Sequence, residues 1–254
     1  MRFPILLSRA RWSVGVVIPA RDEEQHIERC IESVIAAIEA CKELQSSFIV
    51  VVADGCVDRT SELARRALGS RGVVVECAAN SPGKARRMGV EAVLAHYSEL
   101  PSSSLWLANT DADTSVPSDW LYKQLSLAAD GTSAIAGIVA VDSFAGHGPN
   151  GARRFERDYI LHADGTHPHV HGANMGIRGD VYLDVGGWSD LSVGEDHCLW
   201  QRVKRRGWPV ISSTASVVTT SGRLVGRATG GFADTLRAKL ESVADVEVQA
   251  GSAL

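Results

Sequence analysis

Short apolar runs alternate with segments of helical periodicity over the first 141 residues. Val14 to Ile18 is an apolar run ended by Pro19, which is typical of a buried strand, whereas the following isoleucines recur at helical spacing. The pattern predicts strands over 14–18, 48–53, 73–75, 105–108 and 135–141. It predicts four helices in this region. The first is capped by Asp22, the second and third cover 58–68 and 82–97, and the fourth carries Pro117 in its first turn. Strands that alternate with helices imply an α/β fold with a mostly parallel sheet.

Beyond Phe144 the pattern is less regular. We expect a helix over 153–162, an extended segment over 167–176, a short helix over 181–185 and a longer one over 196–206. A Gly-rich stretch starts at about residue 221, and a further helix is expected over 232–243. Because no linker interrupts the chain, we expect one domain over 1–220 and a C-terminal extension over 221–254.

Composition removes several classes of protein. The chain has 254 residues, is 45% hydrophobic and 22% charged, and its net charge of −4 gives no reason to expect a nucleic-acid partner. No apolar stretch reaches the ~20 residues of a membrane-spanning helix, and the run at 4–7 is too short for a signal-peptide core. The five cysteines are scattered, with no C-x-x-C, so we expect free thiols and a cytoplasmic protein.

Two carboxylates, Asp111 and Asp113, directly follow the apolar run over 105–108. Like charges this close repel each other unless a cation lies between them. Mg2+ and Mn2+ prefer such oxygen ligands, together with the oxygens of a diphosphate. In open α/β sheets the ligand crevice lies at the carboxyl ends of the strands, where this pair would lie. The alternative is an Asp-rich turn that caps the next helix.

Other candidates follow neighbouring strands. Pro19, Ala20, Arg21 and Glu23 lie in the turn after the first strand, which lacks the glycine fingerprints of dinucleotide-binding and P-loop proteins. Phosphates would then have to be held by a metal and by side chains. Asp54 ends the second strand, where its carboxylate could accept a hydrogen bond from a base or a ribose, or simply form an Asp-Gly turn.

Cations open one of the predicted helices. Gly83, Lys84 and Arg86 lie in its first turn, which is unfavourable for the helix dipole, so an anionic partner would explain them. A solvated basic face is the alternative.

A second acidic pair, Glu195 and Asp196, could supply a general base or could simply start a helix. His167, His169 and His171 alternate and would share one face of an extended segment. They could bind a metal or line a polar pocket. We favour the pocket, since no thiolate or carboxylate shares their spacing.

Taken together, these motifs make residues 14 to 210 resemble the family 2 glycosyltransferases of the GT-A fold. The motifs that carry the resemblance are Val16–Glu23, Val51–Thr60, Gly83–Arg86, Asp111 with Asp113, Gly172–Met175, Gly186–Trp188 and Glu195 with Asp196. The resemblance implies a Rossmann-like, mostly parallel sheet flanked by helices. A donor half would cover about 14–115, and a smaller acceptor half about 116–220. It also implies a nucleotide-diphospho-sugar donor and an acceptor hydroxyl.

The resemblance implies a role for each candidate. Donor-binding residues would be Pro19, Ala20, Arg21, Glu23, Asp54, Gly83, Lys84, Arg86 and Asp111. Asp113, aided by Asp111, would ligate Mn2+ or Mg2+. Asp196 would deprotonate the acceptor, Glu195 would orient it, and the anomeric carbon would be inverted by in-line displacement. His169, His171 and His197 are candidates for pocket residues or a third metal ligand.

Two departures from the family pattern shape the expected reaction. The usual Asp-Asp-Gly-Ser is Ala53–Cys56 here, which leaves Asp54 as the one acidic contact to the base. The Q-x-x-R-W motif of processive synthases is missing at Gln201–Arg206. We therefore expect a hexosyltransferase-type enzyme that transfers a single sugar. The alternatives are a sugar-1-phosphate nucleotidyltransferase, which needs a Gly-rich basic loop after the first strand, and a non-catalytic nucleotide-sugar-binding module, which would not need both Asp113 and Asp196.

Overall fold

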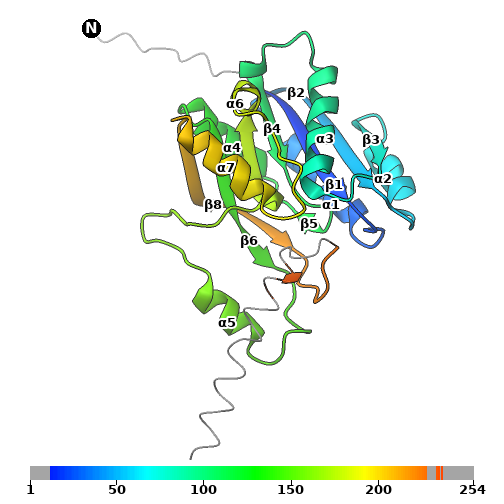
Figure 1. The fold of residues 1–254 in the computed structure, drawn as a ribbon, viewed down its shortest axis with the longest axis vertical. Coiled ribbons are helices and arrows are strands. Elements are labelled where there is room, and N and C mark those ends of the chain that lie inside the picture. The colour runs from blue at the N-terminus through cyan, green and yellow to red at the C-terminus, as the bar shows by residue number, and fades with distance from the viewer. Residues whose placement is uncertain (1–11, 228–232, 235, 237–254) are drawn as a thin grey trace, which may run out of the picture.

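The computed structural model describes residues 12–227, 233, 234 and 236. The segment at 4–7 and most of the helix expected over 232–243 lie outside the described residues. Eight strands form one sheet in the order β3-β2-β1-β4-β7-β6-β8-β5 (Figure 1). The strands are β1 (Trp12–Ala20), β2 (Leu44–Asp54), β3 (Gly72–Cys77), β4 (Leu105–Asn109), β5 (Thr114–Ser115), β6 (Ala134–Val141), β7 (Met175–Arg178) and β8 (Val210–Thr220).

Parallel pairing dominates this sheet, as the sequence predicts. β3, β2, β1 and β4 run parallel to one another, and β6 runs parallel to β8. β7 is antiparallel to both β4 and β6, and the short β5 is antiparallel to β8. The first half of the chain therefore presents the carboxyl ends of its strands at one edge.

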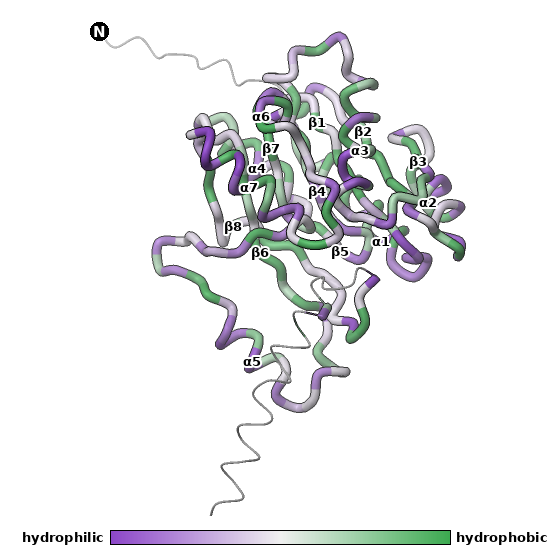
Figure 2. Tube along the Cα trace, in the orientation of Figure 1, coloured by the Kyte–Doolittle hydropathy of each residue, from purple (hydrophilic) through white to green (hydrophobic). Residues whose placement is uncertain are grey.

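Helices cover both faces of the sheet. They are α1 (Ile27–Ala40), α2 (Thr60–Leu68), α3 (Pro82–His96), α4 (Trp120–Ala129), α5 (Gly151–Asp158), α6 (Gly179–Asp184) and α7 (Glu195–Arg205), with 3-10 turns η1 (Ser102–Ser104) and η2 (Gly172–Asn174). Two buried clusters lie on opposite faces: one packs the sheet against α1, α2 and α4, and the other packs it against α3, α6 and α7. Figure 2 shows hydrophobic residues along the strands, whereas α5 is largely hydrophilic.

Strand β1 supplies both clusters because its side chains alternate between the two faces. Val14, Val16 and Ile18 belong to the first cluster and Val17 to the second, and all four are fully buried. Gly15 lies under α3, where an added Cβ would be 2.1 Å from a methyl carbon of Val93. The glycine therefore allows α3 to pack closely against β1, one of the strands that carry the site.

Two predicted helix starts are wrong. Asp22 does not cap α1, which begins at Ile27. Instead its backbone is left-handed (φ 51°) and its carboxylate accepts the Val57 N–H at 2.8 Å. Pro117 lies before α4 rather than in its first turn, and its carbonyl accepts the Trp120 N–H at 3.0 Å. In both cases the residue lies in a loop before the helix and accepts a hydrogen bond there.

The second half of the chain departs most from expectation. Strand β8 is not predicted, and the extended segment expected over 167–176 forms a strand only from Met175, after η2. The helix expected over 153–162 is α5, which spans Gly151–Asp158. It lies on an excursion between β6 and η2 that leaves the body of the sheet (Figure 1). Tertiary pairing, rather than local pattern, decides these elements.

Candidate active site

One edge of the sheet collects the predicted acidic motifs. Ala20 pairs with Ala53, and Val17 with Asn109, so β1, β2 and β4 end side by side. Because β7 is antiparallel, its first residue Met175 pairs with Asn109 and brings η2 to the same edge. The loops that follow β1, β2 and β4 therefore meet the start of the second half of the chain.

Arg86 connects the two acidic pairs. It lies in the first turns of α3, is only 4% exposed, and its Nη2 is 2.6 Å from Asp111 Oδ1. Its other terminal nitrogen donates to Glu195, at the start of α7. The guanidinium also lies over the Trp188 ring, 5.3 Å from the ring centroid. For Arg86, the anionic partners that would explain a cation at this helix start are thus internal, and they join both halves of the chain.

The buried network shifts the pKa values of Arg86 and Glu195. Burial alone would lower the pKa of Arg86, but the facing carboxylates of Asp111 and Glu195 raise it above its ordinary value. Burial raises the pKa of Glu195, against the opposing effect of Arg86. Space is also limited, because a Cβ on Gly172 of η2 would be 2.4 Å from Arg86 Nη2. The glycine of the Gly172–Met175 motif therefore lets η2 close over the guanidinium.

A second arginine, Arg223, bridges the other two carboxylates of this edge. Its Nη2 lies 2.7 Å from Asp113 Oδ2 and 2.7 Å from Glu23 Oε1. Asp113 also accepts hydrogen bonds from the hydroxyls of Thr220 (3.3 Å) and Thr114 (3.4 Å). Burial raises the pKa of Asp113 to about 6, although Arg223 opposes this shift. Sequence analysis missed Arg223, because a single arginine in a Gly-rich stretch gives no sign of which residues it faces.

The donor set at Asp113 fits a hard divalent cation. Asp113 and Glu23 offer carboxylate oxygens and share Arg223, and Asp111, which pairs with Arg86, is close enough to raise the pKa of Asp113. Mg2+ and Mn2+ commonly take one or two carboxylates and complete their shells with substrate phosphates and water. A full cage of protein ligands is therefore not required.

The loops after β1 and β2 are tied together around Asp54. This carboxylate is 6% exposed, its Oδ1 accepts the Asn80 N–H at 2.9 Å, and its Oδ2 lies 3.5 Å from Arg21 Nη2. Arg21 Nε also donates to the Asp54 carbonyl at 2.9 Å. Pro19 and Ala20 end β1 beside them. The predicted base-binding residues are thus brought together.

Two predicted donor-binding residues at the start of α3, Gly83 and Lys84, lie in different surroundings. Ser81 caps the helix by accepting the Lys84 N–H at 3.3 Å, and the Lys84 side chain is exposed. Gly83 is buried against the loop before α7: its N–H donates to the Leu191 carbonyl at 3.3 Å, and an added Cβ would be 2.1 Å from the Ser189 carbonyl oxygen. Close packing of α3 on this loop explains the glycine, a role that the sequence does not reveal.

Asp196 lies in the first turn of α7, next to Glu195. Its Oδ2 accepts the Gly172 N–H at 3.0 Å and its Oδ1 accepts the His197 N–H at 2.7 Å. Its side chain is half-buried, whereas His197 is exposed. Asp196 is therefore oriented by two backbone donors at the mouth of the Arg86 network.

The three alternating histidines share one face, as predicted. Their rings stack at centroid spacings of 5.9 Å, and Tyr159 of the α5 excursion stacks on His169 at 4.0 Å. Nε2 of His167 and of His169 lie 3.2 and 3.0 Å from the carbonyls of Ala136 and Ile160, and His171 Nε2 lies 2.9 Å from the Tyr159 hydroxyl. Burial lowers the pKa of His171 to about 4, so this imidazole is neutral.

Among the described residues, the ligand-type side chains of Asp22, Cys56 and Asp58 lie within 4.8 Å of one another. The two carboxylates of this group accept hydrogen bonds from backbone N–H groups: Asp22 from Val57 at 2.8 Å and Asp58 from Glu24 at 3.0 Å. The group therefore fastens two loops to each other. All five cysteines lie in the described part of the chain and none forms a disulfide.

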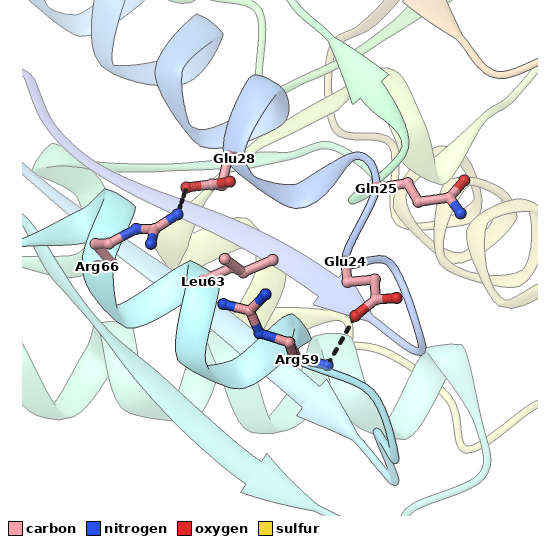
Figure 3. A pocket seen from close by; sticks show the side chains of 6 residues that line it. All are labelled: Glu24, Gln25, Glu28, Arg59, Leu63 and Arg66. Atoms are coloured by element: carbon pink, nitrogen blue, oxygen red, sulfur yellow. Dashed lines mark hydrogen bonds and ion pairs between the residues drawn. The ribbon is translucent and has the colours of Figure 1, made fainter.

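A hollow lies between the starts of α1 and α2 (Figure 3). Its lining residues are Glu24, Gln25, Glu28, Arg59, Leu63 and Arg66. Arg66 pairs with Glu28 at 2.6 Å, and the Arg59 N–H donates to Glu24 at 3.2 Å. Because these charged groups already have partners, the hollow adds nothing to the site.

Comparison with protein families identifies the class. The profile of Glycosyl transferase family 2 matches residues 15–186, which include the β1 and β2 motifs, both aspartates at Asp111 and Asp113, and η2. The chain therefore belongs to this family. Comparison with curated protein sequences gives no match.

Solved structures confirm the GT-A fold. S. aureus TarS residues 1–349 in complex with UDP is similar with a TM-score of 0.58 and 11% identity, over 84% of this chain and 61% of that one. Mannosyltransferase PcManGT from Pyrobaculum calidifontis, in complex with GDP-Man and Mn2+, gives 0.59 and 17%, over 95% and 75%. A longer S. aureus TarS structure is matched over 36% of its length, with a TM-score of 0.58 and 11% identity. No helix in the described part of this chain is long and apolar enough to cross a membrane.

Proposed function

We propose that the chain transfers a single sugar from a nucleotide-diphospho-sugar to an acceptor hydroxyl, with inversion and with the help of Mn2+ or Mg2+. The observation that carries the proposal is the Arg86 bridge, which joins Asp111 at 2.6 Å to Glu195. It brings the pair after β4 and the pair that starts α7 into one network. A metal-binding motif and a candidate base next to each other are what direct displacement at a sugar carbon requires.

The donor half offers groups suited to a nucleoside diphosphate. Asp54 and Arg21 present hydrogen-bonding groups for a base and ribose, and the exposed Lys84 offers a cation for phosphate. Asp113 would hold the divalent ion, which when bound supplies charge neutralisation for the departing diphosphate. The bound UDP and the bound GDP-Man with Mn2+ of the two similar structures are in keeping with a donor of this class.

The acceptor half supplies the base. We assign Asp196, whose oxygens are oriented by the N–H groups of Gly172 and His197, to accept the proton of the acceptor hydroxyl. The acceptor oxygen then forms a bond to the anomeric carbon as the bond from that carbon to the diphosphate oxygen breaks. The electron pair leaves with the nucleoside diphosphate, so attack from the opposite face inverts the configuration.

The residues of α7 are in keeping with the transfer of a single sugar. Where the processive motif would place its arginine and tryptophan, this chain has Lys204 and Arg205, and the nearby Arg202 has a structural role. It donates to the carbonyls of Val185 and Gly187, and to the Ser189 hydroxyl at 3.2 Å. This arginine therefore fixes the Gly186-Gly187 turn instead of facing a growing polymer.

The test starts with a screen of UDP-, GDP- and other nucleotide-sugars with Mn2+, by thermal shift. A ligand at ~100 times its dissociation constant stabilises the fold by about 2.7 kcal/mol, which is readily detected. Donor hydrolysis or transfer is then measured for the wild type, for Asp113→Ala and for the control Asp119→Ala, an exposed aspartate paired with Lys123 at the start of α4. We expect Asp113→Ala alone to lose activity and metal-dependent donor binding.

Several results would contradict parts of this proposal. Undiminished activity in EDTA would contradict the proposed metal dependence. An NMR spectrum that shows a product with the anomeric configuration of the donor would contradict an inverting mechanism. A mass spectrum that shows a ladder of added sugars would contradict the transfer of a single sugar. Formation of a nucleotide-sugar and pyrophosphate from a sugar phosphate would identify a nucleotidyltransferase instead.

A further inference from the structure

Arg223 lies where a cation bound to Asp113 would be expected. Its Nη2 is 2.7 Å from both Asp113 Oδ2 and Glu23 Oε1, and its Nη1 donates to Glu23 Oε2 at 3.0 Å. The two carboxylates come from the loops after β4 and β1, and the arginine comes from the segment after β8. A guanidinium between two carboxylates compensates their repulsion in the way that a divalent ion would.

The two carboxylates need such a cation. Glu23 is 4% exposed and the Asp113 side chain 12% exposed, so water screens their charges poorly. Two other basic groups face Glu23 but not Asp113: His26 Nδ1 lies 3.1 Å from Glu23 Oε2, and Arg227 Nε lies 3.9 Å from Glu23 Oε1. Arg86 is committed to Asp111 and Glu195. Arg223 is thus the cation in contact with Asp113 among the described residues.

The backbone beside Arg223 is held in place. The Gly222 N–H donates to Asp142 Oδ1 at 2.9 Å, and the Gly222 carbonyl accepts from His147 Nε2 at 2.8 Å. An added Cβ at Gly222 would be 1.8 Å from the Ser143 carbonyl oxygen, so the segment lies directly against this loop. The guanidinium can therefore leave Asp113 by rotation about its own side-chain bonds, without a shift of β8.

We propose that Arg223 is a resident cation that occupies the Asp113 site of the donor-free enzyme and must release Asp113 before a divalent ion binds. This inference rests on the proposed role of Asp113 as a metal ligand. Arg223 then sets the affinity of the free enzyme for metal. It favours loading in the presence of the donor, whose diphosphate adds ligands to the ion and offers the displaced guanidinium a new anion.

The test measures Mn2+ binding to the 254-residue chain without nucleotide, by the EPR signal of free Mn2+. The variants are Arg223→Gln, Arg223→Lys, Asp113→Asn and the matched control Arg65→Gln, which removes the same charge from an exposed pair with Glu76. An adjacent positive charge lowers the affinity of a carboxylate for a proton by about tenfold or more, and a metal ion meets the same repulsion. We expect Arg223→Gln to bind Mn2+ about tenfold more tightly than wild type, and Arg65→Gln to match wild type.

The other variants separate this inference from simpler ones. Arg223→Lys, which keeps the charge but loses the two-pronged contact, should lie between wild type and Arg223→Gln, and Asp113→Asn should bind Mn2+ most weakly. Thermal melting of each variant checks that it is folded. Equal Mn2+ affinity in Arg223→Gln and wild type, weaker binding in Arg223→Gln, or no binding by Arg223→Gln at millimolar Mn2+ would each overturn the inference. These results leave the proposed transfer intact, whereas activity in EDTA contradicts metal dependence itself.

Discussion

Replacement of Arg86 by methionine tests the network that joins the two halves of the site. Methionine keeps most of the side-chain length but leaves Asp111 and Glu195 without their shared cation. Removal of one partner from a buried ion pair costs roughly 3–5 kcal/mol, because a charge is left buried and uncompensated. The Asp111 side chain is 36% exposed and Glu195 is 8% exposed, so most of the penalty falls on Glu195. We therefore expect a loss near the lower limit, about 3 kcal/mol of the free energy of unfolding.

The penalty should depend on pH in a defined direction. Burial already raises the pKa of Glu195, and loss of Arg86 removes the group that opposes this shift. A carboxyl group whose folded pKa lies above its unfolded value binds more protons in the folded state, so its contribution to stability is lost as pH rises from the unfolded pKa through the folded one. The difference between Arg86→Met and wild type should thus be larger at about pH 8 than at about pH 5.

Urea denaturation followed by far-UV circular dichroism measures these differences. A double-mutant cycle with Glu195→Gln isolates the ionic part, since Arg86→Met should cost about 1 kcal/mol or less when the partner cannot ionise. Equal losses in both backgrounds and at both pH values would show that Arg86 contributes only packing on Trp188, and the reasoning from charge would be refuted.

Three further predictions concern the proposed reaction. Asp54→Ala should weaken donor affinity while turnover at saturating donor falls far less than in Asp113→Ala, and isothermal titration with the donor measures this; an unchanged dissociation constant would leave Asp54 as a turn residue. Asp196→Asn should reduce turnover by roughly 100-fold or more while donor binding persists, and full activity would remove the base assignment. His171→Phe should keep the ring stack with Tyr159 but lose the hydrogen bond to its hydroxyl; a fall in activity with unchanged melting temperature would indicate a role in the pocket, whereas unchanged kinetics would indicate packing alone.

Strand and helix types in the first half could be predicted because their information is local. β1, β2 and β4 contain short apolar runs that are buried on both faces, so each can be predicted as a strand without knowledge of its neighbours. The second half was less predictable. β8 carries serine and threonine among its valines, and it becomes a strand because it pairs with β6. η2 and β7 likewise depend on the place that β4 offers them.

The sequence by itself determined that acidic motifs follow the strands of a mostly parallel sheet, which is enough to bring Asp54 and Asp111 to one edge. Only the tertiary structure decided which cation faces which carboxylate. Arg86 and Asp111 are separated by 25 residues, Arg86 and Glu195 by 109, and Arg223 and Glu23 by 200. Side-chain periodicity reports which face of an element is buried, but not which element packs there. The pairing of charges across the site is therefore a property of the folded chain.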